Sequence, residues 1–235
     1  MHKDVIVVGA GISGIAAGYN LKKKCPSKSF LMLEGRESLG GTWDLFKYPG
    51  IRSDSDMHTL GFRFKPWIHD KSIADGPSIL NYLNETVDEY SLRENILLNH
   101  NVSSANWNSH DSIWELEILF KDELINMTCG FLFLCGGYYS YSKPHMPDFK
   151  NQEDFTGQVI HPQFWNNQID YGNKKIIVIG SGATAVTLIP AIAETAHHVT
   201  MLQRSPSYVV SWPSEDAKNK FLKRFLPIKF TYFLI

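Results

Sequence analysis

Three glycines, Gly9, Gly11 and Gly14, follow the apolar run Val5–Val8 in the spacing GxGxxG. In this pattern the first glycine permits a tight turn, the second lets the backbone approach a pyrophosphate, and the third lets a helix pack closely on a strand. A helix that begins here presents unpaired N–H groups and the positive end of its dipole to a phosphate. These residues therefore predict a diphosphate-binding turn.

A carboxylate follows at the place where the adenosine of a dinucleotide would lie. Glu34 comes directly after a second apolar run, Phe30–Leu33, and can accept hydrogen bonds from a ribose diol. Without a ligand, the same residues would form an ordinary glycine turn and a solvated glutamate. The order of strand, turn, helix, strand and acid favours a βαβ unit that holds FAD.

Two loops after this unit carry residues suited to a cofactor site. The segment Gly40-Gly41-Thr42-Trp43 could lie against phosphates, or could be an ordinary turn with a core tryptophan. Arg52, Asp54 and Asp56 follow in a loop rich in proline and glycine. They either line a site or form a charged surface turn.

A second glycine turn, with Gly180, Gly182 and Ala185, follows the apolar run 175–179. Alanine is a tolerated variant at its third position. The next strand ends before Arg204 and Ser205, where an acid would repel a 2′-phosphate and an arginine can bind one. This favours NADPH over NADH, and the alternative is a solvated arginine at the end of a strand.

The order of the expected strands and helices around these residues predicts an α/β protein with two Rossmann-like βαβ units. Residues 77–92 have apolar side chains at helical spacing, and residues 96–128 alternate as an antiparallel β meander expected of the first unit. A buried strand is predicted at Phe131–Cys135. Prolines and polar residues at 140–156 predict a linker, and strand 199–202 completes the second unit.

Composition restricts the classes of function. The formal net charge of −1 gives no field that would attract nucleic acid, and no apolar run approaches the roughly 18 residues of a membrane span. The three cysteines form no CxxC pair, which indicates free thiols in the cytoplasm. We expect a cytoplasmic protein that binds no metal.

The segment Phe155–Trp165 fits FxGxxxHxxxW and lies just before the second glycine turn. Set between two GxGxx[GA] motifs, it resembles the Baeyer–Villiger group of class B flavoprotein monooxygenases. The segments GGTWDLF, YPGIRSDSDMHTLGFRFKPW and IGSGATAVTL are similar to the ethionamide-activating branch of that group. The resemblance covers about residues 4–226, and it departs at Asn166, where the motif usually has proline.

This resemblance implies a set of cofactor-binding residues. Those expected along FAD are Gly9, Gly11, Ser13, Gly14, Glu34, Gly41, Thr42, Trp43, Asp44, Leu45 and Val102. Those expected near both flavin and nicotinamide are Arg52, Ser53 and Asp54. Those expected to bind NADPH are Gly180, Ser181, Gly182, Ala183, Thr184, Ala185, Val186, Thr187, Arg204 and Ser205.

The resemblance also implies two residues with a part in catalysis. Asp54 would be the partner of a catalytic arginine that lies outside this sequence. His161 would serve in the linker that couples the two domains as NADP moves, and its alternative is a loop histidine with a satisfied hydrogen bond.

The implied activity is an NADPH- and FAD-dependent monooxygenation. One oxygen atom from O2, through a flavin peroxide, would enter a ketone or oxygenate the sulfur of a thioether or thioamide. The alternatives are a flavin-dependent NADPH reductase, or a truncated remnant that binds flavin or nucleotide without catalysis.

The resemblance predicts that the chain is truncated, with the C-terminal parts of both domains missing. The predicted division is an FAD-binding domain at 1–139, a linker at 140–170, a partial NADPH-binding domain at 171–215 and the start of a helical insertion at 216–235. Within 217–226, lysines and an arginine beside phenylalanines and leucines could instead form an amphipathic helix on a membrane surface.

Overall fold

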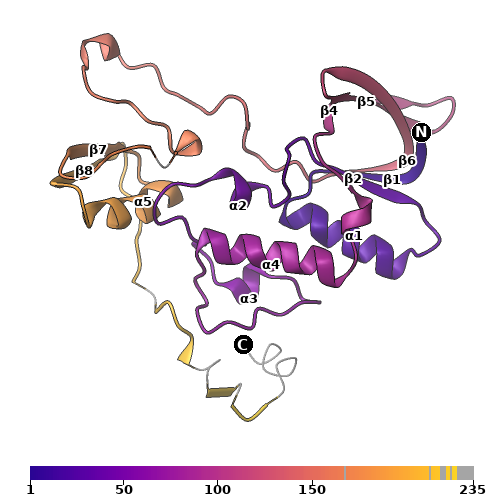
Figure 1. The fold of residues 1–235 in the computed structure, drawn as a ribbon, viewed down its shortest axis with the longest axis horizontal. Helices are drawn as coiled ribbons and strands as arrows, with labels where there is room; N and C mark the ends of the chain where they lie inside the picture. Colours follow the sequence, from indigo (N-terminus) through magenta and orange to yellow (C-terminus); the bar gives the residue numbers. More distant parts are fainter. Residues whose placement is uncertain (167, 212, 218–220, 223, 227–235) are drawn as a thin grey trace. The chain divides into compact units, whose positions relative to one another are not determined.

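The computed structural model describes the chain except residues 167, 212, 218–220, 223 and 227–235 (Figure 1). The described residues form two compact units. The first comprises Met1–Leu45 and Leu80–Tyr141, and the second comprises Phe46–Ile79 and Ser142–Ile235 apart from the gaps just given. Residues 46–79, which the sequence prediction includes in the FAD-binding domain, therefore belong to the second unit.

The first unit contains a six-stranded sheet with the strand order β3-β2-β1-β6-β5-β4. Its strands are β1 (His2–Val8), β2 (Phe30–Leu33), β3 (Ile96–Leu97), β4 (Asn101–Asn108), β5 (Ile113–Phe120) and β6 (Glu123–Leu134). Strands β3, β2, β1 and β6 are parallel neighbours, whereas β6, β5 and β4 are antiparallel neighbours. The sheet is thus a parallel core continued by the predicted antiparallel meander.

Strand β6 belongs to both parts of this sheet. Its residues 123–129 pair antiparallel with β5, and its residues 128–134 pair parallel with β1. The sequence pattern predicts two elements here, the end of the meander and a separate strand at 131–135. The structure joins the two, because the backbone stays extended through Gly130.

One hydrophobic cluster connects the two parts of the sheet. Buried side chains of the parallel strands, such as Ile6 and Leu33, pack with Leu116 and Ile118 of β5. Leu116 and Ile118 alternate with exposed glutamates, as expected for a strand with one buried face.

Helix α1 (Ile12–Lys24) connects β1 to β2 and ends with three lysines, a favourable charge near the carboxyl end of a helix dipole. Helix α2 (Thr42–Leu45) is a single turn. Helix α4 (Gly76–Glu89) matches the amphipathic segment predicted at 77–92. A short 3-10 turn, Arg93–Asn95, leads from α4 to β3.

The second unit contains the second βαβ motif. Strands β7 (Lys175–Ile179) and β8 (His198–Leu202) are parallel, and α5 (Ala183–Ala193) connects them, as Figure 1 shows. The same unit contains α3 (Met57–Leu60) and two 3-10 turns, Gln152–Asp154 and Pro162–Phe164. The fold class is therefore confirmed as α/β with two Rossmann-like motifs, the first carrying an antiparallel meander.

The segment predicted as a helical insertion or membrane-surface helix lies mostly outside the described residues. Lys218, Lys220 and Lys223 are among the residues the structure does not describe, and so is everything after Leu226. In the described part of the chain, none of the helices combines the length and the apolar character that crossing a bilayer requires.

Candidate nucleotide-binding sites

The first glycine turn has backbone geometry that only glycine permits. Gly9 has a φ of +102°, and a Cβ there would lie 2.5 Å from the carbonyl oxygen of Cys135. A Cβ on Gly14 would lie 1.9 Å from the carbonyl oxygen of Gly9. Gly9 and Gly14 thus bring the end of β1, the start of α1 and the end of β6 into direct backbone contact.

The amino end of α1 fits a diphosphate. Gly11 is the N-cap residue, and no side chain caps the helix there. The first N–H groups of an α-helix have no partner within the helix, so an anion can receive them. Gly41 lies across from this turn, because a Cβ on Gly11 would be 3.6 Å from the Gly41 Cα. The turn and the GGTW loop therefore meet with no side chain between them.

Ser13 and Cys135 meet beside this turn. Burial raises the pKa of the Cys135 thiol, and a hydrogen bond with Ser13 partly opposes that rise. Cys135 is thus a neutral thiol at physiological pH.

Glu34 is fixed at the end of β2 by backbone donors. Its side chain is almost fully buried, with the residue 3% exposed. The N–H of Ala10 donates to Oε2 over 2.9 Å, and the N–H of Arg36 donates to Oε1 over 3.0 Å. A carboxylate has about four acceptor positions, so two remain for the hydroxyls of a ribose. The Glu34 side chain therefore links the first glycine turn to the end of β2, and it can still accept hydrogen bonds from a ligand.

Val102 follows two residues, His100 and Asn101, that contact the chain at Glu34 and Gly35. The N–H of His100 donates to the Glu34 carbonyl over 2.8 Å, and Asn101 approaches Gly35. Val102 follows in β4 at a bulge in the pairing with β5. The backbone of residues 100 and 101 thus lies beside the end of β2, and Val102 is the next residue along β4.

The GGTW loop is held by an arginine that sequence reasoning missed. The guanidinium of Arg36 lies 2.7 Å from the carboxylate of Asp44 and 5.5 Å from the ring centroid of Tyr141. The hydroxyl of Ser38 also donates to Asp44. The negative charge of Asp44 is therefore paired within the protein. The sequence carried one signal for this role, because Arg36 follows Glu34 by two residues at the end of β2.

Thr42, Trp43 and Leu45 form the single turn α2 together with Asp44. All four are half-buried. The N–H of Leu45 donates to the carbonyl of Gly41 over 2.9 Å, so this turn begins at the loop that faces Gly11. The structure therefore places the predicted residues of this loop at the first glycine turn.

The loop that follows exposes two charged residues on either side of a buried serine. Ser53 is 1% exposed, its N–H donates to the Ala74 carbonyl over 2.8 Å, and its hydroxyl accepts from the Ala74 N–H over 3.1 Å. Arg52 and Asp54 are exposed. Across the described residues, neither side chain makes a hydrogen bond or ion pair. Ser53 thus anchors the loop, and the exposed side chains of Arg52 and Asp54 can contact a ligand or another polypeptide.

The second glycine turn is open. Gly180 has a φ of +124°, and a Cβ on either Gly180 or Gly182 would have no heavy atom within 4 Å. Gly182 is the N-cap of α5, with no side-chain cap. No described heavy atom thus crowds either glycine at this helix start, which leaves room for a ligand there.

Arg204 and Ser205 lie at the same edge of the sheet as this turn, because β7 and β8 are parallel and the N–H of Gly180 donates to the Leu202 carbonyl over 2.8 Å. The Ser181 hydroxyl lies 3.4 Å from the Ser205 carbonyl and 3.0 Å from the Ser207 hydroxyl. Arg204 is exposed. Sequence reasoning missed Ser207, which no spacing rule identifies.

The remaining residues of the predicted NADPH set lie on α5 and differ in exposure. Ala183 is exposed, Thr184 and Val186 are half-buried, and Ala185 is buried. Thr187 is 3% exposed, and its hydroxyl bonds within the protein. The first turn of α5 can therefore face a ligand, whereas the Thr187 side chain faces the protein interior.

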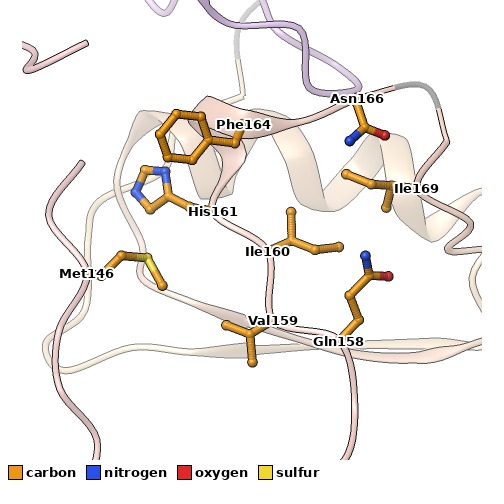
Figure 2. A pocket seen from close by; sticks show the side chains of 8 residues that line it. All are labelled: Met146, Gln158, Val159, Ile160, His161, Phe164, Asn166 and Ile169. Atoms are coloured by element: carbon orange, nitrogen blue, oxygen red, sulfur yellow. The ribbon is translucent and has the colours of Figure 1, made fainter. Parts of the chain in front are cut away.

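His161 lies in a shallow hollow of the linker, with a volume of about 380 Å³ (Figure 2). Its Nδ1 accepts a hydrogen bond from the Gln163 N–H over 3.2 Å and so caps the 3-10 turn Pro162–Phe164. Burial lowers the pKa of His161. The ring is therefore neutral with its proton on Nε2, a donor beside Met146 and Phe164 in the hollow.

Comparison with known proteins identifies the family to which the chain belongs. The family described as pyridine nucleotide-disulphide oxidoreductase matches residues 6–225. The FAD-containing monooxygenase EthA of Mycobacterium tuberculosis is 53% identical over 232 residues, which are 98% of this chain and 47% of EthA.

Two solved structures share the fold. A steroid monooxygenase bound to NADP has a TM-score of 0.82 and 28% identity, over 100% of this chain and 43% of its own. An ε-caprolactone-bound cyclohexanone monooxygenase has a TM-score of 0.84 and 26% identity, over 100% of this chain and 45% of its own. The chain thus spans about half the length of these relatives. It belongs to the pyridine nucleotide-disulphide oxidoreductase family and, within it, to the class B flavoprotein monooxygenases of the Baeyer–Villiger type.

Proposed function

We propose that this chain binds FAD at the first glycine turn and NADPH at the second, as the nucleotide-binding part of a monooxygenase. The observation that carries the proposal is a difference between two similar helix starts. The first is followed by a buried carboxylate, Glu34, and the second by an exposed guanidinium, Arg204. A carboxylate accepts from a ribose diol, whereas a guanidinium pairs with a 2′-phosphate.

In this proposal the FAD diphosphate takes the N–H groups that follow Gly11, and Glu34 takes the adenosine ribose. The GGTW loop covers the same diphosphate from the other side, because Gly41 faces Gly11 without an intervening side chain. When bound, FAD would supply the two-electron chemistry that accepts hydride from NADPH and activates O2.

The NADPH diphosphate takes the open start of α5, at Gly182 to Ala185. Arg204 and Ser205 bind the 2′-phosphate, and Ser181 contacts the same region through the backbone of Ser205. Thr187 contributes through its place in α5 rather than through its hydroxyl, which is bonded inside the protein.

The proposed reaction uses NADPH and O2 to place one oxygen atom in an organic substrate and release the other as water. The substrate is a ketone, which becomes an ester, or a thioether or thioamide, which is oxygenated at sulfur. Arg52 and Asp54 are exposed and so can meet the reacting groups or an arginine supplied by further polypeptide. The absence of a CxxC pair among three cysteines disfavours a disulfide reductase.

Binding by the 235-residue chain tests the first part of the proposal. We expect purified chain to bind FAD with a flavin absorbance band, and to prefer NADP+ over NAD+ by about tenfold or more, which is about 1.4 kcal/mol. Arg204→Gln should remove this preference and leave FAD affinity unchanged. A chain that binds neither cofactor would refute the proposal.

Oxygenation tests the second part. The chain is combined with a separate polypeptide matching the half of M. tuberculosis EthA that it does not cover, and then given NADPH, O2 and a ketone or thioether. An oxygenated product supports a monooxygenase. NADPH oxidation without any oxygenated product, under conditions where both cofactors bind, would favour a reductase.

A further inference from the structure

The loop that carries Arg52 and Asp54 contacts helix α5 of the second nucleotide motif, 139 residues further along the chain. The hydroxyl of Tyr48 lies 3.1 Å from the Thr187 Oγ1, and the two residues are 6% and 3% exposed. All of these residues belong to the second unit. The contact is therefore a buried hydrogen bond between a loop and a helix.

The backbone of the loop touches the same turn of the helix. Gly50 has a φ of +78°, and a Cβ there would lie 2.3 Å from the Thr187 carbonyl oxygen and 2.8 Å from the Ala191 Cβ. The loop backbone therefore approaches the backbone of α5 directly, beside the methyl group of Ala191. Residues 48 and 50 thus fix the loop to one turn of the helix.

The direction of the hydrogen bond follows from the proton count. The Thr187 hydroxyl lies 2.9 Å from the Ala183 carbonyl and 3.1 Å from the Thr184 carbonyl, so its single proton points into the helix. Tyr48 must therefore donate to Thr187. The resulting chain of bonds runs from Tyr48 through Thr187 to Ala183, the first residue of α5.

The other end of the loop is held separately. Ser53 pairs with Ala74 through backbone and hydroxyl, and the N–H of Gly76 donates to the Ile51 carbonyl over 2.9 Å. The stretch between Tyr48 and Ser53 is therefore attached at both ends. A displacement of the first turn of α5 would be transmitted to it through Thr187.

We propose that Tyr48 and Thr187 are a positioning pair that couples the start of α5 to the loop bearing Arg52 and Asp54. This inference rests on the proposed function, since it takes the start of α5 as the NADPH diphosphate site. Nucleotide bound there orders the first turn of α5, and the buried hydrogen bond passes that order to the loop. The pair sets where Arg52 and Asp54 stand while NADPH is bound.

Hydrogen exchange of the full 235-residue chain with and without saturating NADP+ tests this coupling. In the wild type we expect NADP+ to slow exchange at residues 180–185 and, by at least about threefold, at residues 50–54. In Tyr48→Phe the first protection should persist while the second falls below about 1.5-fold. Thr187→Ser keeps the acceptor and should behave as the wild type. Strand β5, in the other unit, provides reference amides.

Thr187→Val removes the acceptor of the same hydrogen bond and is an independent second variant, in which a folded sample should likewise lose the protection at residues 50–54. Protection at 180–185 without protection at 50–54 in the wild type would overturn the coupling alone. Equal loop protection in the wild type and in a folded variant would also overturn it. No protection at 180–185 would refute the proposed NADPH site and this inference together.

Discussion

The guanidinium of Arg36 and the carboxylate of Asp44 lie 2.7 Å apart and join the end of β2 to the GGTW loop. Both side chains are largely buried, so removing one charge leaves the other without compensation. We expect Arg36→Met to weaken FAD binding by about tenfold, because Asp44 and its loop lose their anchor. Arg36→Lys should restore part of the affinity. Titration of FAD by flavin fluorescence measures both.

Lys28→Met is a matched control for this prediction, because it removes an ion pair of the same unit in which both partners are well exposed. Lys28 lies 3.0 Å from Asp4. Exposed pairs contribute little, so FAD affinity should stay as in the wild type. Unchanged FAD affinity in Arg36→Met would show that the loop does not need this anchor.

The two glycine turns should respond differently to alanine. At Gly182 an added Cβ meets open space, so Gly182→Ala should change the free energy of unfolding by no more than about 1 kcal/mol. NADP+ affinity should nevertheless fall by about tenfold or more, because the methyl group takes the space proposed for the diphosphate. At Gly14 the Cβ would overlap the Gly9 carbonyl, so Gly14→Ala should prevent folding of the first unit.

Calorimetry and circular dichroism separate these two results. Wild-type NADP+ affinity in a folded Gly182→Ala would place the nucleotide elsewhere.

His161 should make stability depend on pH. Burial lowers its pKa below the ordinary value of 6.5, so below that pH the unfolded chain binds the proton more readily than the folded one. The contribution of His161 to stability is therefore fully present above about pH 6.5 and falls as the pH drops toward the folded pKa. Protonation at Nδ1 would also break the cap on Gln163.

Asparagine can cap the same turn without titrating, so His161→Asn is the control. Urea unfolding between about pH 5 and pH 8, a range that includes the ordinary histidine pKa, should show a smaller loss of stability at low pH in the variant. Identical pH profiles for the two proteins would contradict the assignment.

The buried bond between Tyr48 and Thr187 should be asymmetric under mutation. In Tyr48→Phe the Thr187 hydroxyl still donates to its helix carbonyl, so the loss should be about 1 kcal/mol. In Thr187→Val the Tyr48 hydroxyl loses its acceptor in a buried site, and the loss should reach about 2 kcal/mol. Denaturant unfolding of both single variants and the double variant gives the comparison. Equal losses would mean that Tyr48 is not the donor.

Much of the fold could be predicted because local patterns and tertiary structure agree. The bounds of β2 and β7 match the apolar runs at Phe30–Leu33 and 175–179, since polar residues or glycine delimit both. Strand β1 begins three residues earlier than its apolar run, because His2 pairs with Thr128 of β6. That extension depends on a strand more than a hundred residues away and has no local signal.

The candidate sites also combine features that the local sequence predicts with features that depend on tertiary contacts. Spacing predicts Gly9, Gly11 and Gly182 as phosphate-binding residues, because such a turn has one backbone geometry. Spacing cannot show that the hydroxyls of Ser53 and Thr187 point into the protein, since burial depends on which segments pack around them. Pairs such as Tyr48 with Thr187 come from tertiary contact alone. The predicted domain boundaries and site residues remain predictions.

Because β6 pairs with both β5 and β1, the length of the meander determines where the end of β6 meets the first glycine turn. The first half of β6 is aligned by the two-residue hairpin at Lys121 and Asp122, and its last residues reach Cys135, whose carbonyl abuts Gly9. We expect that lengthening this hairpin by two residues shifts the register of β6 on β1. The shift would move the Cys135 carbonyl away from Gly9. Insertions at this surface hairpin would then alter the geometry of the first glycine turn.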